Sequence, residues 1–293
     1  MITVLLTFFL IFGTIEWFSF QALRTLLQRK KMLVLYQAVS LLLAVYFIYS
    51  ISQFDRSIGQ TRKTMLVLGF ALMVYLPKAV LALVMLTEDF FRVGKGSVNY
   101  LAKKKKDQPF FASRRKFVSQ MGLGLASIPF LSIMYGIFEG KYNFKVIKQR
   151  IYFPDLPEEF DGFKITQISD VHSGSFDNPE KINYAIDLVN QQDSDMILFT
   201  GDIVNTHAKE MMPWIDAFKR IKKHQYGKYS VLGNHDYGEY VTWPSEKEKE
   251  ANFKAIKDLY GQIDFKLLLN EHTFIEKGGQ KIALVGVENW GHR

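Results

Sequence analysis

Four long apolar runs in the first half of the chain constrain its fold more than any other feature of the sequence. They cover approximately residues 2–20, 32–51, 65–86 and 117–138. A helix of roughly 20 residues crosses the hydrocarbon core of a bilayer. None of the runs carries the polar face that a helix on the surface of a soluble bundle needs. Residues 1–143 are therefore predicted to form a transmembrane region with four helices.

The charges between these runs predict their orientation. Basic residues follow the first run and fill the loop 92–116 before the fourth: Arg24, Arg29, Lys30, Lys31, residues 103–106, Arg114, Arg115 and Lys116. Such residues accumulate on the cytoplasmic side of membrane proteins. The loop between the second and third runs is less basic. We therefore expect a multi-pass protein of the inner membrane, whose N-terminus and whose residues after Lys141 lie outside the cytoplasm.

The stretch "SRRKFVSQMGLGLASIPF", residues 113–130, admits two interpretations. It resembles a twin-arginine export signal, which a receptor reads as an address, and the export machinery would then be a partner. Alternatively, Arg114 and Arg115 only add positive charge to the cytoplasmic loop. Both interpretations place the C-terminal half of the chain on the same side of the membrane.

Two charged residues lie within the apolar runs. Glu16 belongs to the first run, and Lys78 follows Pro77 in the third. Charges inside a bilayer are costly and are usually paired or functional. A Glu16–Lys78 pair is one interpretation. Extension of the Lys78 side chain toward the membrane surface is the other, which we favour.

The two halves of the chain differ in charge. Residues 1–143 contain 18 Lys and Arg against 6 Asp and Glu, and the remainder contains 19 against 23, so the net charge of +8 comes from the first half. A nucleic-acid-binding protein would concentrate basic residues on its soluble domain, so that class is excluded. The chain has no cysteine, which excludes disulfides, cysteine metal sites and a thiol nucleophile.

Residues 144–293 show the pattern of an α/β domain. Apolar runs rich in β-formers alternate with helical patterns, which is typical of layered α/β structures. The predicted strands are residues 145–153, 163–168, 196–199, 229–232, 265–269 and 281–287, and the predicted helices are residues 180–191, 209–223 and 246–260. The second half is therefore expected to fold as a soluble α/β domain.

Three of the predicted strands end in polar residues suited to a metal site. "FKITQISDVHSG" leads to Asp170 and His172, "MILFTGDIVN" to Gly201 and Asp202, and "YSVLGNHDYGEY" to Gly233, Asn234, His235 and Asp236. Open α/β sheets place their sites at the carboxyl ends of strands. Carboxylate, amide and imidazole groups suit Zn, Mn or Fe. The glycines before Asp202 and Asn234 let the backbone turn closely beneath bound ions, so we predict a metal site at this edge.

The set "DVH…GD…GNHD" resembles the calcineurin-like metallophosphoesterases, in particular the membrane-anchored bacterial members with an export signal. The resemblance covers residue 151 to about residue 290. It implies a four-layer αββα sandwich and a hydrolytic site with two divalent metal ions, drawn from Mn, Zn, Fe and Mg. Asp170 and His172 would bind the first ion, Asp202 would bridge both, and Asn234 would bind the second. His235 would act as general acid or stabilise the transition state, and Asp236 would orient it.

The sequence departs from the family pattern near its end. After the Asn-His motif the family supplies a lone His and then a Gly-His-x-His strand end. Neither is matched, because His272 falls in an apparent hairpin and His292 is followed by one residue. We therefore expect residues 144–293 to be a C-terminally incomplete phosphoesterase domain. With too few ligands for both ions, the chain as it stands is expected to have little or no activity.

The expected function is metal-dependent hydrolysis of phosphomonoester or phosphodiester bonds by a membrane-anchored, extracytoplasmic enzyme, through attack of an activated water. Tethering to the lipid bilayer favours lipid-linked phosphates as substrates. The alternative is a non-catalytic membrane protein whose truncated phosphoesterase-like domain binds a metal or a partner without turnover. His207 could face the substrate, whereas His224, at the end of a lysine-rich helix, is expected to be solvated.

Overall fold

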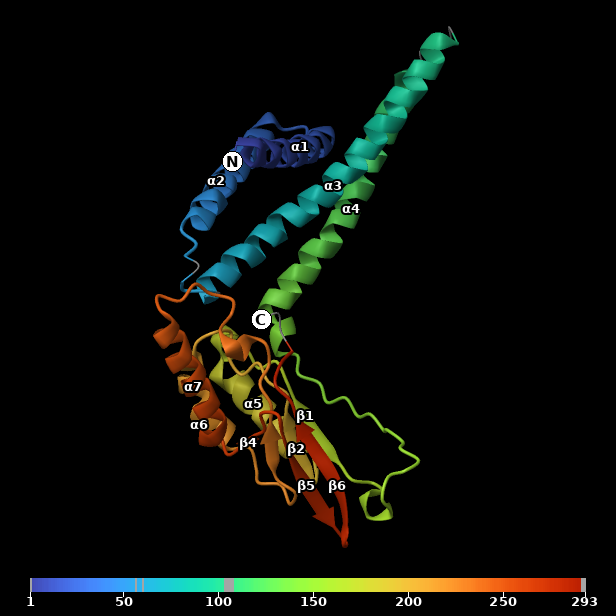
Figure 1. The fold of residues 1–293 in the computed structure, drawn as a ribbon. Helices are drawn as coiled ribbons and strands as arrows, with labels where there is room; N and C mark the ends of the chain where they lie inside the picture. Colours follow the sequence, from blue (N-terminus) through green and yellow to red (C-terminus); the bar gives the residue numbers. More distant parts are fainter. Residues whose placement is uncertain (1, 56, 60, 103–107, 291–293) are drawn as a thin grey trace. The chain divides into compact units, whose positions relative to one another are not determined.

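The computed structural model describes residues 2–55, 57–59, 61–102 and 108–290. The chain divides into two compact units (Figure 1). The first comprises Met1–Phe54 and Met65–Asn143, and the second comprises Phe144–Arg293 together with the short segment Asp55–Thr64. The sequence pattern did not predict that this segment, which lies between two apolar runs, groups with the second unit.

The first unit consists of four helices: α1 (Ile2–Leu26), α2 (Lys30–Ser52), α3 (Arg62–Leu101) and α4 (Gln108–Phe138). All four predicted apolar runs are thus helical. Among the residues that the structure describes, three stretches are long and apolar enough to cross a bilayer: Lys30–Ser52, Lys63–Leu101 and Arg114–Phe138. The helical region is therefore membrane-like, whereas a fourth span in α1 stays a prediction.

Both α3 and α4 extend well beyond the predicted runs. They have 40 and 31 residues, so helical structure fills most of the predicted loop 92–116. Residues 103–106 of that loop lie outside the described residues. Arg115 of α4 supports the extension, because it contacts Asp89 of α3 at 2.6 Å and Glu88 at 3.3 Å. One arginine of the export-signal pattern therefore has a structural role between two helices.

Glu16 and Lys78 form an ion pair in the first unit. Lys78 Nζ lies 2.7 Å from Glu16 Oε1, and the Ser40 hydroxyl donates to Glu16 Oε2 at 2.7 Å. The rings of Tyr36 and Tyr75 lie 5.4 and 5.1 Å from the same Nζ. The favoured interpretation, extension of Lys78 toward the membrane surface, is therefore wrong. Lys78 is paired instead, because a carboxylate and two aromatic faces are within reach. This network joins α1, α2 and α3.

The second unit is built on a four-stranded parallel sheet. Its strands lie in the order β1 (Ile165–Ile168), β2 (Met196–Phe199), β3 (Lys228–Ser230) and β4 (Lys266–Leu267). Ile168 lies beside Phe199, which in turn lies beside Ser230. The first three strands therefore end side by side at one edge. A hairpin of β5 (Glu271–Lys277) and β6 (Gln280–Gly286) forms a separate antiparallel sheet.

Helices and the hairpin cover opposite faces of the parallel sheet (Figure 1). The helices are α5 (Pro179–Asn190), α6 (Ile215–Lys219) and α7 (Glu246–Gln262). On β2, Met196 packs in one cluster with Ile275 of β5, whereas Phe199 contacts the ring of Tyr260 in α7, with centroids 5.4 Å apart. The described residues thus form three layers, and the second helical layer of the expected sandwich is not seen among them.

Two parts of the second unit differ from the prediction. Residues 145–153 form no strand, because no described strand pairs with them, and Ile147 and Tyr152 are 87% and 79% exposed. The predicted helix 209–223 is interrupted at Pro213, which lacks the N–H that a continuous helix needs. Only Ile215–Lys219 is α-helical there. The other predicted strands and helices are found with modest shifts at their ends.

Candidate metal centre

The loops after β1 and β2 run side by side from the carboxyl edge of the sheet. The backbone N–H of Asp170 donates to the Gly201 carbonyl at 3.1 Å, and that of His172 donates to the Asp202 carbonyl at 2.9 Å. These hydrogen bonds continue the pairing of the two strands beyond their ends. They bring the first two polar motifs together, as the strand-end pattern predicts.

Three of the predicted ligands have a left-handed backbone. The φ angle is 52° at Asp170, 46° at His172 and 57° at Asp202. Five non-glycine residues of the described chain have a positive φ, and three of them fall at this one site. The conformation costs a residue with a Cβ roughly 1–2 kcal/mol. Strain of this kind clusters where a function requires it, so the backbone marks this edge as a site independently of the side chains.

The side chains of Asp170, His172 and Asp202 converge. One ligand atom from each lies within 4.8 Å of the other two. His172 Nε2 is 3.8 Å from Asp202 Oδ2 and 4.0 Å from Asp170 Oδ1. An ion about 2.0–2.2 Å from each ligand needs ligand atoms about 3–4 Å apart, so these donors fit one divalent ion. Asp202 is buried and Asp170 is exposed, so the cluster reaches from the interior to solvent.

Gly201 and Gly233 allow the loops after β2 and β3 to touch. A Cβ on Gly201 would collide with the backbone nitrogen of Gly233, and a Cβ on Gly233 would lie 2.5 Å from Asp202 Cγ. Gly201 also has a φ of 95°, which favours glycine. The close approach of the backbone therefore requires the glycines before Asp202 and Asn234, as the sequence predicts.

The carboxylate of Asp236 holds the two loops together. It is buried and accepts the backbone N–H groups of Gly233, Asp202 and Ile203 at 3.0, 2.9 and 3.0 Å. It also accepts the hydroxyl of Tyr260 at 2.8 Å. Burial raises the pKa of Asp236 to about 6, although these donors oppose the rise. The predicted role of Asp236 was to orient the His235 ring. Its oxygens instead accept three backbone N–H groups and the Tyr260 hydroxyl.

His235 is held by contacts that the sequence does not reveal. Its backbone N–H donates to Asp202 Oδ1 at 2.8 Å, and its ring Nδ1 hydrogen-bonds to the Asn205 carbonyl at 2.7 Å. Because a carbonyl only accepts, Nδ1 carries a proton. The ring of Tyr240 stacks on that of His235 with centroids 4.3 Å apart, and the His172 ring meets it edge-on at 4.6 Å. The imidazole of His235 therefore lies beside the converging ligands.

Asn234 is tied to Tyr240. Its Nδ2 donates to the Tyr240 hydroxyl at 2.6 Å, which leaves the amide oxygen as the acceptor that an ion can use. Tyr240 therefore contacts both Asn234 and His235. Sequence reasoning missed it. The available signal was an aromatic residue shortly after the Asn-His pair in "GNHDYGEY".

The remaining histidines that the structure describes lie outside the cluster. The ring of His207 contacts that of Trp243 at 5.1 Å, and His224 hydrogen-bonds to a backbone carbonyl at 3.0 Å. Burial lowers the pKa of both, so His224 is not the fully solvated residue that we expected. His272 lies on β5, within the hairpin, and His292 lies outside the described residues.

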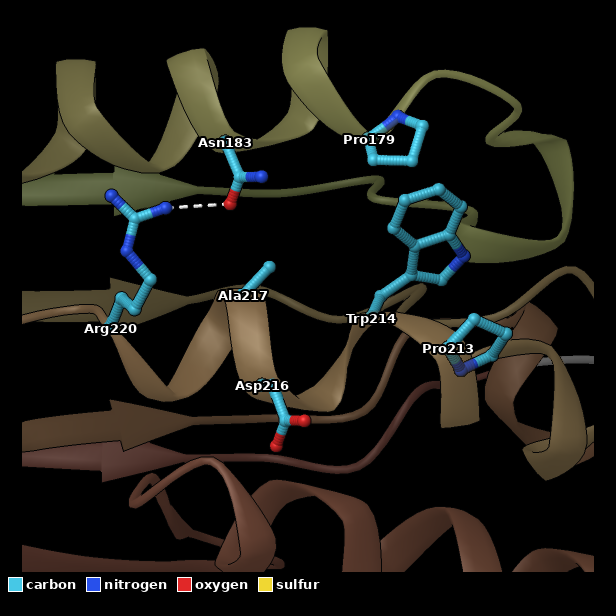
Figure 2. A pocket seen from close by; sticks show the side chains of 7 residues that line it. All are labelled: Pro179, Asn183, Pro213, Trp214, Asp216, Ala217 and Arg220. Atoms are coloured by element: carbon cyan, nitrogen blue, oxygen red, sulfur yellow. Dashed lines mark hydrogen bonds between the residues drawn. The ribbon is translucent and has the colours of Figure 1, made fainter.

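A surface hollow of about 340 Å³ between α5 and α6 is separate from the cluster (Figure 2). Trp214, Asn183 and Arg220 are among its lining residues, and Arg220 donates to Asn183 Oδ1 at 2.6 Å. Arg220 also pairs with Asp187, so its charge is already compensated. None of the lining residues is a predicted metal ligand, and we assign the hollow no function.

Two protein families match the chain. The family described as "Probable Calcineurin-like phosphoesterase, transmembrane domain" matches residues 1–141. The family described as "Calcineurin-like phosphoesterase" matches residues 163–293. The first match covers the helical unit, and the second covers every residue of the candidate metal centre.

Curated relatives agree with these matches. An uncharacterized metallophosphoesterase of Helicobacter pylori is 30% identical over 131 residues, which are 44% of this chain and 34% of the relative. The uncharacterized metallophosphoesterase YkuE of Bacillus subtilis is 36% identical over 92 residues, 30% of this chain and 31% of the relative. A transmembrane protein with metallophosphoesterase domain of Danio rerio is 26% identical over 159 residues, 53% and 34% of the two chains.

The matched region spans about a third of the length of these curated relatives. No solved structure matches the chain.

Proposed function

The chain belongs to the calcineurin-like phosphoesterases that carry an N-terminal transmembrane domain, and we propose that the full-length gene product hydrolyses phosphomonoester or phosphodiester bonds with two divalent metal ions. The observation that carries the proposal is the convergence of Asp170, His172 and Asp202 at adjacent strand ends, each on a left-handed backbone. Three strained residues in one cluster favour a site with a function over a surface turn.

The ligands divide between the two ions in this proposal. Asp170 and His172 would hold the first ion, Asp202 would be shared by both, and Asn234 would give its amide oxygen to the second. Bound ions of this kind lower the pKa of water and offset negative charge on a phosphoryl group. Asp202 is suited to bridging because it is buried and its backbone N–H is fixed by Asp236.

His235 donates a proton to the leaving-group oxygen in the same proposal. Its Nδ1–H donates to the Asn205 carbonyl, which fixes the ring. The second nitrogen, Nε2, then carries the proton that is transferred. A general acid placed in this way contributes roughly 10²–10⁴-fold to the rate.

We also propose that the phosphoesterase unit lies outside the cytoplasm, with α1 to α4 crossing the inner membrane. The segment Asp55–Thr64 between α2 and α3 belongs to the same compact unit as the residues after Asn143. This supports a topology in which both lie on one side of the membrane. Basic residues at the other ends of α3 and α4, such as Arg92 and Lys116, indicate that the opposite side is cytoplasmic.

The substrate in this proposal is a phosphate ester attached to a lipid. A hydrolase anchored in a bilayer meets substrates of the same bilayer at a raised effective concentration. A soluble phosphate ester gains no such advantage. The bilayer is therefore both the anchor and the source of substrate.

The full-length gene product, purified in detergent, tests the proposal. We expect chelator-treated protein to be inactive toward p-nitrophenyl phosphate and bis(p-nitrophenyl) phosphate, and Mn²⁺ to restore turnover in the wild type but not in Asp202→Asn. Phosphatidic acid in mixed micelles should be hydrolysed faster than glycerol phosphate. Calorimetric binding of Mn²⁺ without turnover of any of these substrates would favour the non-catalytic alternative.

A further inference from the structure

The segment between α2 and α3 packs against residues that surround His235. This segment belongs to the same compact unit as the phosphoesterase domain. The backbone of Ile58 hydrogen-bonds to the ring of His207. Gly59 is buried beside Val241 and Thr206. A loop from the N-terminal half of the sequence is therefore part of the wall around the candidate metal centre.

Gly59 leaves no room for a side chain. A Cβ at this position would lie 2.5 Å from Val241 Cγ1 and 3.6 Å from Thr206 Oγ1. Its φ is 74°, which residues with a Cβ rarely adopt. The position therefore requires glycine for its backbone conformation and for its close packing.

The two residues beside Gly59 each follow a residue that holds His235. Thr206 follows Asn205, whose carbonyl hydrogen-bonds to the His235 ring. Val241 follows Tyr240, whose ring stacks on His235. Gly59 thus lies between the two stretches of chain that fix the imidazole from its edge and from its face.

The two stretches are not equally constrained by other contacts. Glu210 accepts the backbone N–H groups of Asn205 and His207 at 2.6 and 3.1 Å, which fixes the first stretch within the domain. Tyr240, on the second stretch, is 57% exposed. The packing of Gly59 on Val241, together with the contact between the rings of His207 and Trp243, therefore keeps the second stretch close to the first.

We propose that Ile58 and Gly59 are positioning residues of the active site. Ile58 hydrogen-bonds to the His207 ring, next to Thr206. Gly59 packs on Val241 and through it keeps Tyr240 in place, so that the His235 ring stays aligned for proton transfer. The loop touches neither substrate nor ion in this arrangement. The inference rests on the role of His235 in the proposed function. If it holds, the loop between α2 and α3 contributes to the activity of the phosphoesterase domain.

Gly59→Ala in the full-length gene product tests the inference, with Gly162→Ala as the matched control. Gly162 has the same φ of 74°, but nothing lies within 4 Å of a Cβ there. The two variants therefore share the backbone cost and differ in the contact. We expect Gly59→Ala to lower kcat for p-nitrophenyl phosphate roughly tenfold to hundredfold, with KM and Mn²⁺ content unchanged. Gly162→Ala should change none of the three.

Two further readouts separate positioning from a merely structural role. Adding Val241→Ala should recover most of the lost kcat, because the nearest remaining atom of residue 241 would be its Cβ at 4.0 Å. Hydrogen exchange of the peptide that contains Tyr240 and Val241 should be faster in Gly59→Ala than in the wild type, and this measurement needs no turnover.

Unchanged exchange together with unchanged kcat in Gly59→Ala would overturn the inference. An equal loss of kcat in Gly59→Ala and Gly162→Ala would also overturn the inference, because the contact with Val241 would then have no effect on turnover. An inactive wild type would instead count against the proposed function, and the exchange measurement alone would decide whether the loop holds the Tyr240 stretch.

Discussion

The carboxylate of Asp236 accepts the backbone N–H of Asp202 at 2.9 Å and so joins the loop after β3 to the loop after β2. Tyr260 of α7 donates to the same carboxylate. One buried side chain thus connects a helix and two loops of the site. Asp202 takes its backbone position from a residue that has no metal-binding role in the proposal.

Tyr260→Phe is expected to destabilise the phosphoesterase unit by about 1.5–3 kcal/mol, because a hydrogen bond to a carboxylate is lost from a buried site. The ring keeps its packing. Unfolding in urea, followed by tryptophan fluorescence, measures the change. Tyr184→Phe is the control, since Tyr184 is 52% exposed on α5. A loss no larger than the control's would mean that the backbone donors alone satisfy Asp236.

Asp202→Asn and His235→Ala should fail in different ways. Asp202→Asn removes the bridging charge, so Mn²⁺ affinity should fall by more than the roughly 10–100-fold that loss of an outer partner costs. His235→Ala should lower kcat roughly 10²–10⁴-fold while metal content stays near that of the wild type. Metal analysis beside steady-state kinetics distinguishes them. Equal metal loss in both variants would contradict the division of roles.

Gly233→Ala should displace the Asp202 carboxylate and weaken metal binding without unfolding the domain. The new Cβ would meet Asp202 Oδ1 and lie 2.5 Å from its Cγ. Gly261→Ala is the matched control, because nothing lies within 4 Å of a Cβ there. Alanine in this helix should be neutral or stabilise it by about 0.5–1 kcal/mol. Wild-type Mn²⁺ affinity in Gly233→Ala would show that the loop can move aside.

Lys228 should make stability depend on alkaline pH. Its buried Nζ donates to the Ile263 and Ile221 carbonyls at 2.9 and 3.2 Å. Burial lowers its pKa below 10.5, while Asp264 opposes this shift and Lys223 adds to it. The unfolded chain then binds the proton more tightly. The free energy of unfolding should therefore rise as pH increases from the folded pKa toward about 10.5.

Lys228→Met supplies the comparison for this pH dependence. The rise in the free energy of unfolding should be smaller in the variant, because no ammonium remains to lose its proton at this position. Urea unfolding across the alkaline range measures both proteins. Parallel pH profiles would show that Lys228 is not the group responsible.

Arg114→Lys should block export of the domain if the twin-arginine pattern is read as an address. The charge is kept, and the contact of Arg115 with Asp89 is left intact. Protease accessibility of the domain in intact spheroplasts measures the outcome. Arg115→Lys is the companion variant, because it alters that contact as well as the pattern. Full accessibility in Arg114→Lys would leave only the loop charges to explain the orientation.

The strand ends of the site could be predicted because their information is local. β2 was predicted with both of its ends, since its apolar run stops at Thr200. Asp170, His172 and Asp202 follow two such runs, and parallel strands place their carboxyl ends together. Order along the chain was therefore enough to predict which residues would meet.

The partners of His235 and Asp236 could not be predicted because they depend on contacts between distant residues. Asp236 receives N–H groups from residues 33 and 34 positions away, and any residue type can supply such a donor. The Asn205 carbonyl is likewise a backbone group without a sequence signal. The strand predicted at residues 145–153 is wrong for a related reason. The β-propensity of a segment depends on its packing against neighbouring strands, and the sequence pattern does not show whether such a neighbour is present.

The pairing of Glu16 with Lys78 also bears on how the protein is made. The two residues are 62 positions apart, which a ribosome adds in roughly 3–12 s at about 5–20 residues per second. In the proposed four-span arrangement, α1 enters the translocon with a carboxylate whose ammonium partner has not been synthesised. An isolated charge at the centre of a bilayer costs about 2.5–3.5 kcal/mol. We therefore expect α1 to wait at the translocon until α3 arrives, so that helices leave it as a group.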